Sequence, residues 1–408
     1  MRRLSVLFAV LALVSACGSL KDETSQVASQ VASQPAHELL YVATATGMTV
    51  VDASTDTVVS TLPVGTLLPD RSRYWTVDSG DRTTVRGIDP ATGADQVSFV
   101  LDGRWSVPAA YGPAPSGLSA NGKWMALVAP PTAVAGNGML NRFAIVDLAQ
   151  RRVDRVVSAN GDVGFDALSD DGRNLYLVEH LVPAPRYAVR VASFSGGLAD
   201  GVLGQIKTAE PEVMNGLYHA SVAVGADWFL SLYSNPLRGP FIHALNTTQL
   251  YAQCILNMPD VPVALRPAWS MVLDAAHAKL YAVNGAGGVV SEVNTGTLTV
   301  QRSNIDLAPA ATTLTTTPLH PAALSADGTR IYVAAEHGVL VIYTGDLSVH
   351  SRYLTDRFVD SVAVSADGQR LYVASAGAIT KVEAATGKPL GTIASATHAL
   401  GLLAVGSR

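Results

Sequence analysis

Cysteine is scarce in this chain, with only Cys17 and Cys254 among 408 residues. A disulfide framework is therefore not expected, and burial of apolar side chains has to supply the stability of the fold.

Charge is also scarce, because Lys, Arg, Asp and Glu make up 15% of the residues and the net charge is −5. No basic stripe interleaved with aromatic residues occurs, which argues against nucleic acid as a partner.

An apolar run long enough to cross a membrane is missing at the N-terminus. The run Leu4–Val14 has eleven residues, whereas a helix needs about 20 to cross the hydrocarbon core of a bilayer. It follows Arg2 and Arg3 and ends as VSAC at residues 14–17. This order resembles the bacterial lipoprotein signal, and the resemblance implies cleavage before Cys17 and a diacylglycerol on its sulfur. An ordinary secretory signal with an incidental Cys17 is the alternative.

This interpretation divides the chain into three parts. Residues 1–16 form the signal peptide, and residues 17–36 hold the lipidated cysteine and a flexible tether that contains SQVASQVASQ. Residues 37–408 form a single folded domain. We therefore expect a protein exported to the bacterial cell envelope and lipid-anchored there, in the outer membrane or on the outer face of the cell membrane.

The body of the chain repeats one short pattern. Residues 324–334 read LSADGTRIYVA and residues 364–374 read VSADGQRLYVA. In each copy an apolar strand precedes a Ser-x-Asp-Gly turn, and a strand of alternating residues follows it. The Ser and Asp side chains can accept backbone N–H groups within the turn, and Gly can take a positive φ where the chain reverses. Further copies begin at residues 118, 168 and 273, with weaker ones at 68 and 224.

A second strand–turn–strand pair follows each copy, such as FAIVDLAQRRVDRVVS at residues 143–158. One unit is therefore four antiparallel strands, A to D, in roughly 40–50 residues. Such repeats predict an all-β fold, a β-propeller whose four-stranded blades bury their faces against one another. Counting the units gives eight blades, with seven as the alternative.

The two ends of the body predict how the ring closes. HELLYVATATG at residues 37–47 is a B strand with no A strand before it, and HALGLLAVGS at 398–407 is an A strand with no B strand after it. We expect the C-terminal strand to pair into the first blade, which removes the open sheet edges. Tyrosine recurs at one position of the B strands, and we expect these side chains to fill the core between blades. They are Tyr176, Tyr281, Tyr332 and Tyr372.

The patterns LYVATATGMTVVDASTDTVVSTLPVG and SADGxRLYVAS resemble the YVTN-type repeat of bacterial propellers. Such propellers are similar to the lactonase-like propellers and to the amine-dehydrogenase heavy chain. The resemblance covers residues 37–408 and implies the fold. It does not imply one function, because these propellers host unrelated activities.

Long connections predict where a site lies. By our strand assignment they join strand B to C or strand D to A, and these connections meet at one face of a propeller, which we call the long-loop face. One-sided growth of loops favours binding at that face, although tight turns on the other face alone could produce it. The long connections span residues 103–115, 129–141, 180–186, 208–219, 234–240, 257–268 and 308–320.

Residues just before the A strands should ring the mouth of the central channel at this face. They are His219, Trp269, His320 and Asp360, with Asp166 as a further carboxylate. Imidazole, indole and carboxylate groups that converge on a concavity suit a ligand pocket, but each could equally cap or pack a loop.

Catalytic motifs are absent: the sequence has no GxSxG, HExxH or CxxC. GLSANGK at residues 117–123 has the spacing of a phosphate-binding loop, but Trp124 replaces the required Ser or Thr and a strand follows. We expect no metal and no cofactor, since the Ser-x-Asp-Gly turns offer too few oxygen ligands for calcium.

These observations predict a binding or scaffold module, anchored to the membrane, that holds an envelope protein or a small molecule at its long-loop face. The alternative is a lactonase-like hydrolase with its site at the channel mouth, which would need a group that polarises a carbonyl and activates water. Docking to a redox protein is a weaker alternative. The residues do not identify the ligand or the partner.

Overall fold

The structure is a computed structural model of the chain. The residues it describes are 37–108, 117–134, 138–183, 186–193, 214–215, 217–235, 239–307, 311, 313–314 and 321–407. The chain separates into two compact units, Met1–Ala36 and His37–Arg408. The predictions for the signal peptide, Cys17 and the tether lie outside the described residues. Among the residues described, no helix has the length and apolar character needed to cross a membrane.

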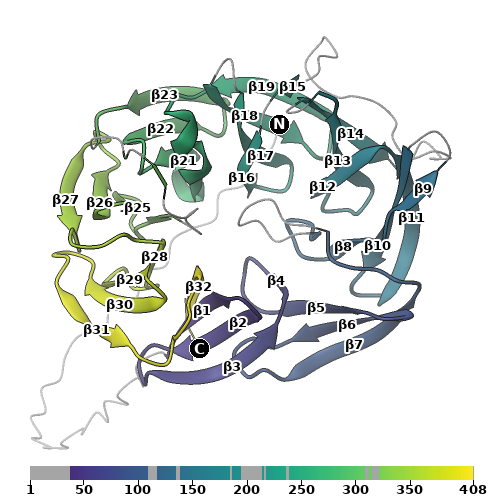
Figure 1. Cartoon of the computed structure of the whole chain (residues 1–408), viewed down its shortest axis with the longest axis horizontal. Helices are drawn as coiled ribbons and strands as arrows, with labels where there is room; N and C mark the ends of the chain where they lie inside the picture. Colours follow the sequence, from purple (N-terminus) through teal and green to yellow (C-terminus); the bar gives the residue numbers. More distant parts are fainter. Residues whose placement is uncertain are drawn as a thin grey trace, which may run out of the picture. The chain divides into compact units, whose positions relative to one another are not determined.

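Eight four-stranded antiparallel sheets form a ring in the second unit, which confirms the predicted eight-bladed β-propeller (Figure 1). From the innermost strand outward, blade 1 holds β32 (Gly401–Ser407), β1 (Glu38–Thr44), β2 (Gly47–Asp52) and β3 (Thr57–Pro63). Blade 2 holds β4 (Gly65–Leu67), β5 (Tyr74–Ser79), β6 (Arg82–Ile88) and β7 (Asp95–Asp102). Blade 3 holds β8 (Trp124–Val128), β10 (Gly138–Asp147) and β11 (Arg152–Asn160), with β9 (Thr132–Val134) paired to β10.

The remaining blades follow the same order. Blade 4 holds β12 (Asp162–Leu168), β13 (Asn174–Leu181), β14 (Arg186–Ser193) and β15 (Met214–Asn215). Blade 5 holds β16 (Leu217–Val224), β17 (Trp228–Asn235), β18 (Gly239–Asn246) and β19 (Tyr251–Asn257). Blade 6 holds β20 (Trp269–Asp274), β21 (Lys279–Asn284), β22 (Val289–Asn294) and β23 (Thr299–Asn304).

Blade 7 holds β24 (Ala322–Leu324), β25 (Arg330–Ala335), β26 (Gly338–Tyr343) and β27 (Val349–Tyr353). Blade 8 holds β28 (Ser361–Val364), β29 (Arg370–Ser375), β30 (Ala378–Glu383) and β31 (Pro389–Ile393). Two short 3₁₀ helices, η2 (Val263–Ala268) and η3 (Ala275–His277), flank β20.

The ring closes as the sequence predicts. β32 pairs antiparallel with β1, from Glu38 opposite Ser407 to Ala43 opposite Gly401. The backbone N–H of Leu402 also donates to Ser361 Oγ of blade 8 at 2.8 Å. The last strand therefore completes the first blade and joins it to its neighbour.

The Ser-x-Asp-Gly turns have the hydrogen bonds expected of them. Ser325 Oγ donates to Asp327 Oδ1 at 2.6 Å and accepts the N–H of Arg330 at 2.9 Å. Asp327 also accepts the N–H of Thr329 at 3.0 Å, and Gly328 has a φ of 70°. Glycine is favoured there because other residues rarely adopt a positive φ. The turns at Ser169 and Ser365 repeat these bonds.

The recurring tyrosines lie between blades, as predicted, and each reaches across to the next blade. We call the packed interface between two adjacent blades a seam and name it by its blades. The Tyr332 hydroxyl donates to Ala384 O at 3.1 Å across seam 7/8, and the Tyr176 hydroxyl donates to Thr247 O at 3.1 Å across seam 4/5. The Tyr372 hydroxyl donates to Glu38 across seam 8/1. Each buried phenol thus fills the core and satisfies an acceptor on the next blade.

Blade 3 departs from the repeat. Among the described residues ahead of β8, the chain makes two isolated antiparallel bridges to that strand, Ser106 with Val128 and Leu118 with Met125, and the N–H of Ala126 donates to Gly117 O at 2.7 Å. The GLSANGK segment therefore forms an A–B turn followed by a strand, in agreement with our rejection of a phosphate-binding loop.

Candidate functional site

The long-loop face is defined by the order of the strands. Because neighbouring strands are antiparallel, the B–C and D–A connections lie at one end of every blade and the A–B and C–D turns lie at the other. One predicted member of this face was wrong. β15, the D strand of blade 4, begins at Met214, so residues 208–213 belong to the C–D connection. The two-residue strand was missed because so short an element shows no alternating pattern.

The most exposed large apolar side chains of the described residues gather on this face. All five that are more than half exposed lie in B–C or D–A connections, from Leu400 at 51% to Val182 at 92%. We call them the apolar tips: Val64, Val182, Val263, Ile305 and Leu400. Single exposed apolar residues are ordinary on a protein surface, and here all five lie at the same end of the blades.

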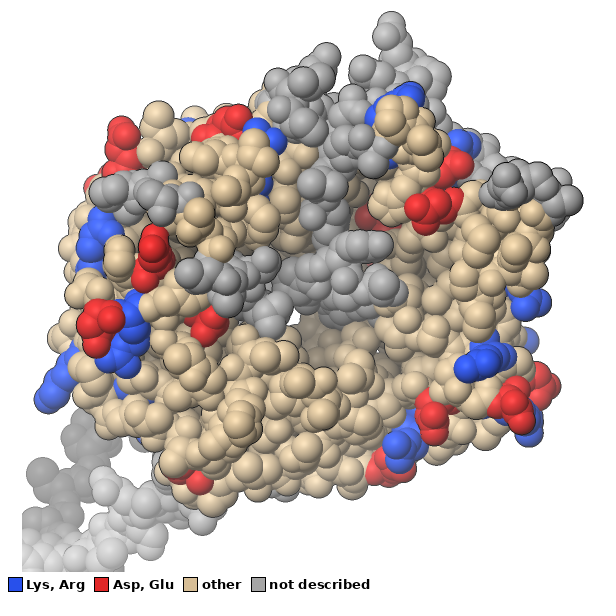
Figure 2. All heavy atoms as spheres, in the orientation of Figure 1, with Lys and Arg blue, Asp and Glu red and all other residues tan. Residues whose placement is uncertain are grey.

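Figure 2 shows one face of the ring in the orientation of Figure 1. Lys, Arg, Asp and Glu side chains lie mainly towards the outer edge, and other residues make up most of the surface over blades 1 and 2. The low content of charged residues in the chain therefore leaves broad uncharged areas on this view of the molecule.

His219 is the extra residue of a β-bulge in β16. The pairing of β16 with β17 shifts register between Tyr218 and Ala220, and His219 lies at the shift. Its Nε2 lies 2.6 Å from Ser234 Oγ. Burial, with the positive charge of Arg266 as a second cause, lowers the pKa of His219 to about 4. The imidazole is therefore neutral at neutral pH.

Arg266 links this histidine to the D–A connection of blades 5 and 6. It lies in η2, is buried, and its Nη2 contacts both carboxylate oxygens of Asp260 at 3.0 and 3.1 Å. The Asn284 side chain donates to Leu265 O at 2.9 Å and so holds η2 against blade 6. These contacts hold the charged side chain of Arg266 near the innermost strand of blade 5. The composition of the connection between blades 5 and 6 did not predict them.

Trp269, a predicted channel-mouth residue, begins β20 and is buried at 3% exposure. It packs with Leu232, Leu265 and Leu280 in the apolar cluster of seam 5/6. Its indole N–H is buried with no hydrogen-bond partner in the part of the chain that the structure describes. The described structure presents this ring to the core rather than to solvent.

The other predicted mouth residues do not join this group. Asp360 directly precedes β28, and its Oδ2 accepts the N–H of Ala376 at 3.2 Å. Blade 7 separates it from the blade of Trp269. His320 lies outside the described residues. The structure therefore leaves His219 on blade 5 and Trp269 on blade 6, directly after η2, with Asp360 two blades beyond Trp269.

A narrow pocket opens beside the D–A connections of blades 6 and 7. Small side chains line it, among them Ala268, Ala286 and Ala334, and Phe358 contributes a ring. Its polar groups come from Thr313 and Glu336. Such a lining suits an apolar side chain rather than a polar metabolite. Among the described residues, no three His, Cys, Asp or Glu side chains are grouped so that they could hold a metal ion.

The sequence comparisons add little to this geometry. No protein-family model matches the sequence, so the YVTN-type repeat stays a prediction. No curated protein matches it either.

The comparison of structures supports the fold. The dihydro-heme d1 dehydrogenase NirN in complex with DHE is similar with a TM-score of 0.50 and 12% identity, over 90% of this chain and 74% of that one. Apo AztD from Citrobacter koseri is similar with a TM-score of 0.50 and 13% identity, over 91% of this chain and 99% of the other. At such identity a likeness shows the fold alone. The chain is thus an eight-bladed β-propeller similar in fold to these two proteins.

Proposed function

We propose that this protein is a binding module of the bacterial cell envelope that holds a partner protein at its long-loop face. The observation that carries the proposal is the concentration of the apolar tips there. The tips belong to blade 4 and to the connections between blades 1 and 2, 5 and 6, 6 and 7, and 8 and 1. They are distributed around the ring, which suits a protein surface better than a small molecule.

We propose that a lipid on Cys17, which the VSAC run at residues 14–17 predicts, anchors the protein to the membrane. Cys17→Ser should then release the protein from membranes into the soluble fraction. Unchanged membrane retention would count against the anchor alone.

The apolar tips can be tested with a matched set of substitutions. One variant carries serine at Val64, Val182 and Val263. The control carries serine at Val58, Val100 and Val156, which are about half exposed and lie on the outermost strands β3, β7 and β11. Cross-linking in cells followed by purification should recover partners with the control and not with the first variant. Equal recovery with both variants would refute the proposal.

Hydrolysis is a second candidate because of the contact between His219 and Ser234. A serine hydroxyl 2.6 Å from a neutral imidazole is the arrangement of a nucleophile and its base. Ser234 is only 3% exposed, which limits the access of a substrate. Turnover in a panel of lactones and esters that is lost in Ser234→Ala would establish hydrolysis. No turnover by the unmodified protein would remove this candidate.

A further inference from the structure

Asp166 occupies in blade 4 the position that His219 occupies in blade 5. The pairing of β12 with β13 shifts register between Phe165 and Ala167, so Asp166 is the extra residue of a bulge in the innermost strand. The residue is buried at 9% exposure. Bulges turn a side chain away from the regular alternation of a strand and occur often beside functional sites.

Seam 4/5, which Asp166 borders, offers little to solvate a carboxylate. Ala167, Tyr176, Val191 and Leu245 form one buried cluster there. A second cluster joins Tyr187 and Val189 of blade 4 to Tyr233 and Phe241 of blade 5. The rings of Tyr187 and Tyr233 stack with centroids 4.6 Å apart. The Tyr187 hydroxyl is buried with no hydrogen-bond partner in the described part of the chain.

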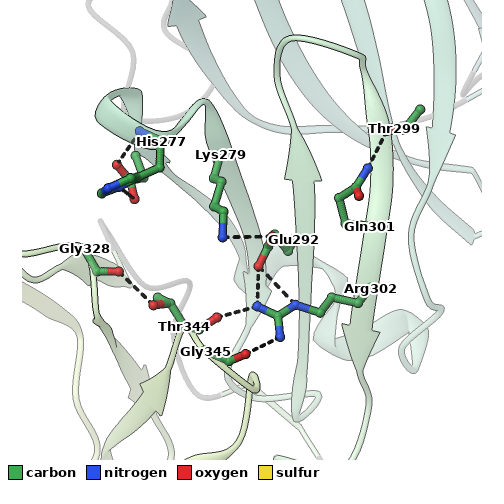
Figure 3. A network of polar contacts seen from close by, with 10 residues as sticks. His277, Lys279, Glu292, Thr299, Gln301, Arg302, Gly328, Thr344 and Gly345 are labelled. Carbon is green, nitrogen blue, oxygen red and sulfur yellow. Dashed lines mark hydrogen bonds and ion pairs between the residues drawn. The ribbon is translucent and has the colours of Figure 1, made fainter.

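Other buried carboxylates of the described propeller have partners. Glu38 pairs with Arg370 and accepts a hydrogen bond from Tyr372. Asp52 contacts His37 and accepts the N–H of Ser54, and Asp274 contacts His277. Glu292 pairs with both Lys279 and Arg302. Figure 3 shows the Glu292 group, in which Arg302 also donates to the carbonyl oxygens of Thr344 and Gly345 on blade 7. Asp166 has no ion pair and no hydrogen bond with any residue that the structure describes.

The titratable groups on the neighbouring strands do not neutralise Asp166. Burial raises the pKa of Tyr176 on β13 and of Tyr187 on β14, and the charge of Asp166 raises both further. From blade 5, Tyr233 on β17 and the buried His243 on β18 lie on the strand faces that pack against blade 4. Burial alone raises the pKa of Asp166 to about 7. The charged residues nearest along the chain, Asp162 and Asp170, are also acids.

We propose that seam 4/5 is a pH-sensitive joint of the propeller, tight while the Asp166 carboxyl is protonated and weakened when it ionises. The bulge places an unpaired carboxyl among packed tyrosines and aliphatic side chains. Ionisation puts a charge there without a cation, and a buried charge without a partner opposes folding. In the other seams that hold a buried carboxylate, a cation or an N–H donor contacts that carboxylate. We therefore expect the weakening on ionisation at seam 4/5 and not at those seams.

The direction of the pH response follows from the raised pKa. The unfolded carboxyl ionises near its ordinary value of 3.8 and the folded one near 7. Below pH 3.8 both states are protonated, and the full stability is present. Above it the unfolded state releases its proton first, so the unfolding equilibrium constant rises by about tenfold for each pH unit up to about 7. Above pH 7 this contribution stays constant.

The experiment compares the unmodified protein with Asp166→Asn, which keeps the size of the side chain and removes the titration. Urea unfolding is measured at pH 5, 6, 7 and 8, and the ratio of the two unfolding constants is followed. The ratio should change by about 50-fold between pH 5 and 7 and by only about twofold between pH 7 and 8. Tyr187→Phe is the control in the same seam, because it removes a hydroxyl that does not titrate in this range. A ratio that does not change with pH would overturn the proposal.

A second measurement covers the case in which Asp166→Asn does not fold. Difference infrared spectra of the unmodified protein between pH 5 and 8 should show the loss of a protonated carboxyl band with a midpoint near pH 7. Labelling the aspartates with ¹³C assigns the band to this residue type. The absence of any aspartate carboxyl that titrates between pH 6 and 8 would overturn the proposal as well.

Discussion

Seams 4/5 and 6/7 each contain a buried carboxylate, and the two carboxylates differ in their partners. In seam 6/7, Glu292 contacts Lys279 Nζ at 3.1 Å and Arg302 Nη2 at 2.6 Å, and Arg302 bonds to blade 7 (Figure 3). In seam 4/5, Asp166 has no ion pair and no hydrogen bond with any described residue, and its charge acts on the phenols of Tyr176 and Tyr187. The same blade architecture thus accommodates a charged carboxylate with cations or an uncharged one without them. The second arrangement makes stability depend on pH near neutrality.

Removing the acid from seam 6/7 should have the largest effect on stability. Glu292→Ala leaves Lys279 and Arg302 facing each other without their shared carboxylate, and breaking such a buried pair costs roughly 3 kcal/mol of unfolding free energy. Urea unfolding at pH 7 measures this loss. Asp356→Ala is the control, because its pair with Arg357 lies at the surface and exposed pairs contribute little. Equal losses for both substitutions would contradict the difference between buried and exposed pairs.

His219 should give a pH response opposite in sign to that of Asp166. Its folded pKa of about 4 lies below the ordinary 6.5, so its contribution is fully present above pH 6.5 and is lost as the pH falls to 4. The loss reaches roughly 3 kcal/mol at the low end. Unfolding of His219→Gln, measured against the unmodified protein from pH 4.5 to 7.5, should lack this component. Parallel curves would show that the imidazole does not titrate as the structure implies.

The tyrosine bonds across seams should contribute less than either titratable group. Tyr332→Phe leaves Ala384 O without its 3.1 Å donor and should lower the unfolding free energy by about 1 kcal/mol. Tyr343→Phe is the matched control, because that ring is more than one-third exposed at the end of β26. If both substitutions have the same effect, the cross-seam bond does not stabilise the ring.

The smallest effect on stability is expected at the apolar tips. Val182→Ser changes a side chain that is 92% exposed, so the unfolding free energy should stay within about 0.5 kcal/mol of the original value. Binding of the partner should weaken nonetheless, since exposed apolar area is what the proposed interface uses. A large loss of stability would place Val182 in a seam rather than on the binding face.

Much of the fold could be predicted because the repeat is local. The Ser-x-Asp-Gly turns and the alternating strands have the same hydrogen bonds wherever they recur, and the unpaired first and last strands implied closure of the ring. Prediction was poorer where the repeat is weak. Residues 208–213 were assigned to the wrong face because β15 is too short to show a pattern. In blade 3 the described residues ahead of β8 make only isolated bridges to it.

The candidate site was predicted in part. His219 was expected just before an A strand and lies instead within β16, at its bulge. Its partners Ser234 and Arg266 come from another strand and from η2. Trp269 lies at the predicted position along the chain, yet its ring is buried in the core. No pattern in the sequence shows which way such a side chain turns, because that depends on the packing of the neighbouring blade.

The sequence alone determined the propeller fold, the closure of the ring and the tyrosines between blades, and the structure decided for eight blades over seven. Each of these follows from strand periodicity and turn chemistry within one repeat. Only the tertiary structure decided which buried groups have partners. Glu292 contacts two cations, Asp166 contacts none among the described residues, and His219 lies near Arg266. These outcomes depend on contacts between residues far apart in the chain and on bulges that shift a side chain by one position. Burial by residues that are distant in the sequence sets the charge states of Asp166 and His219. A local sequence pattern does not show these charge states.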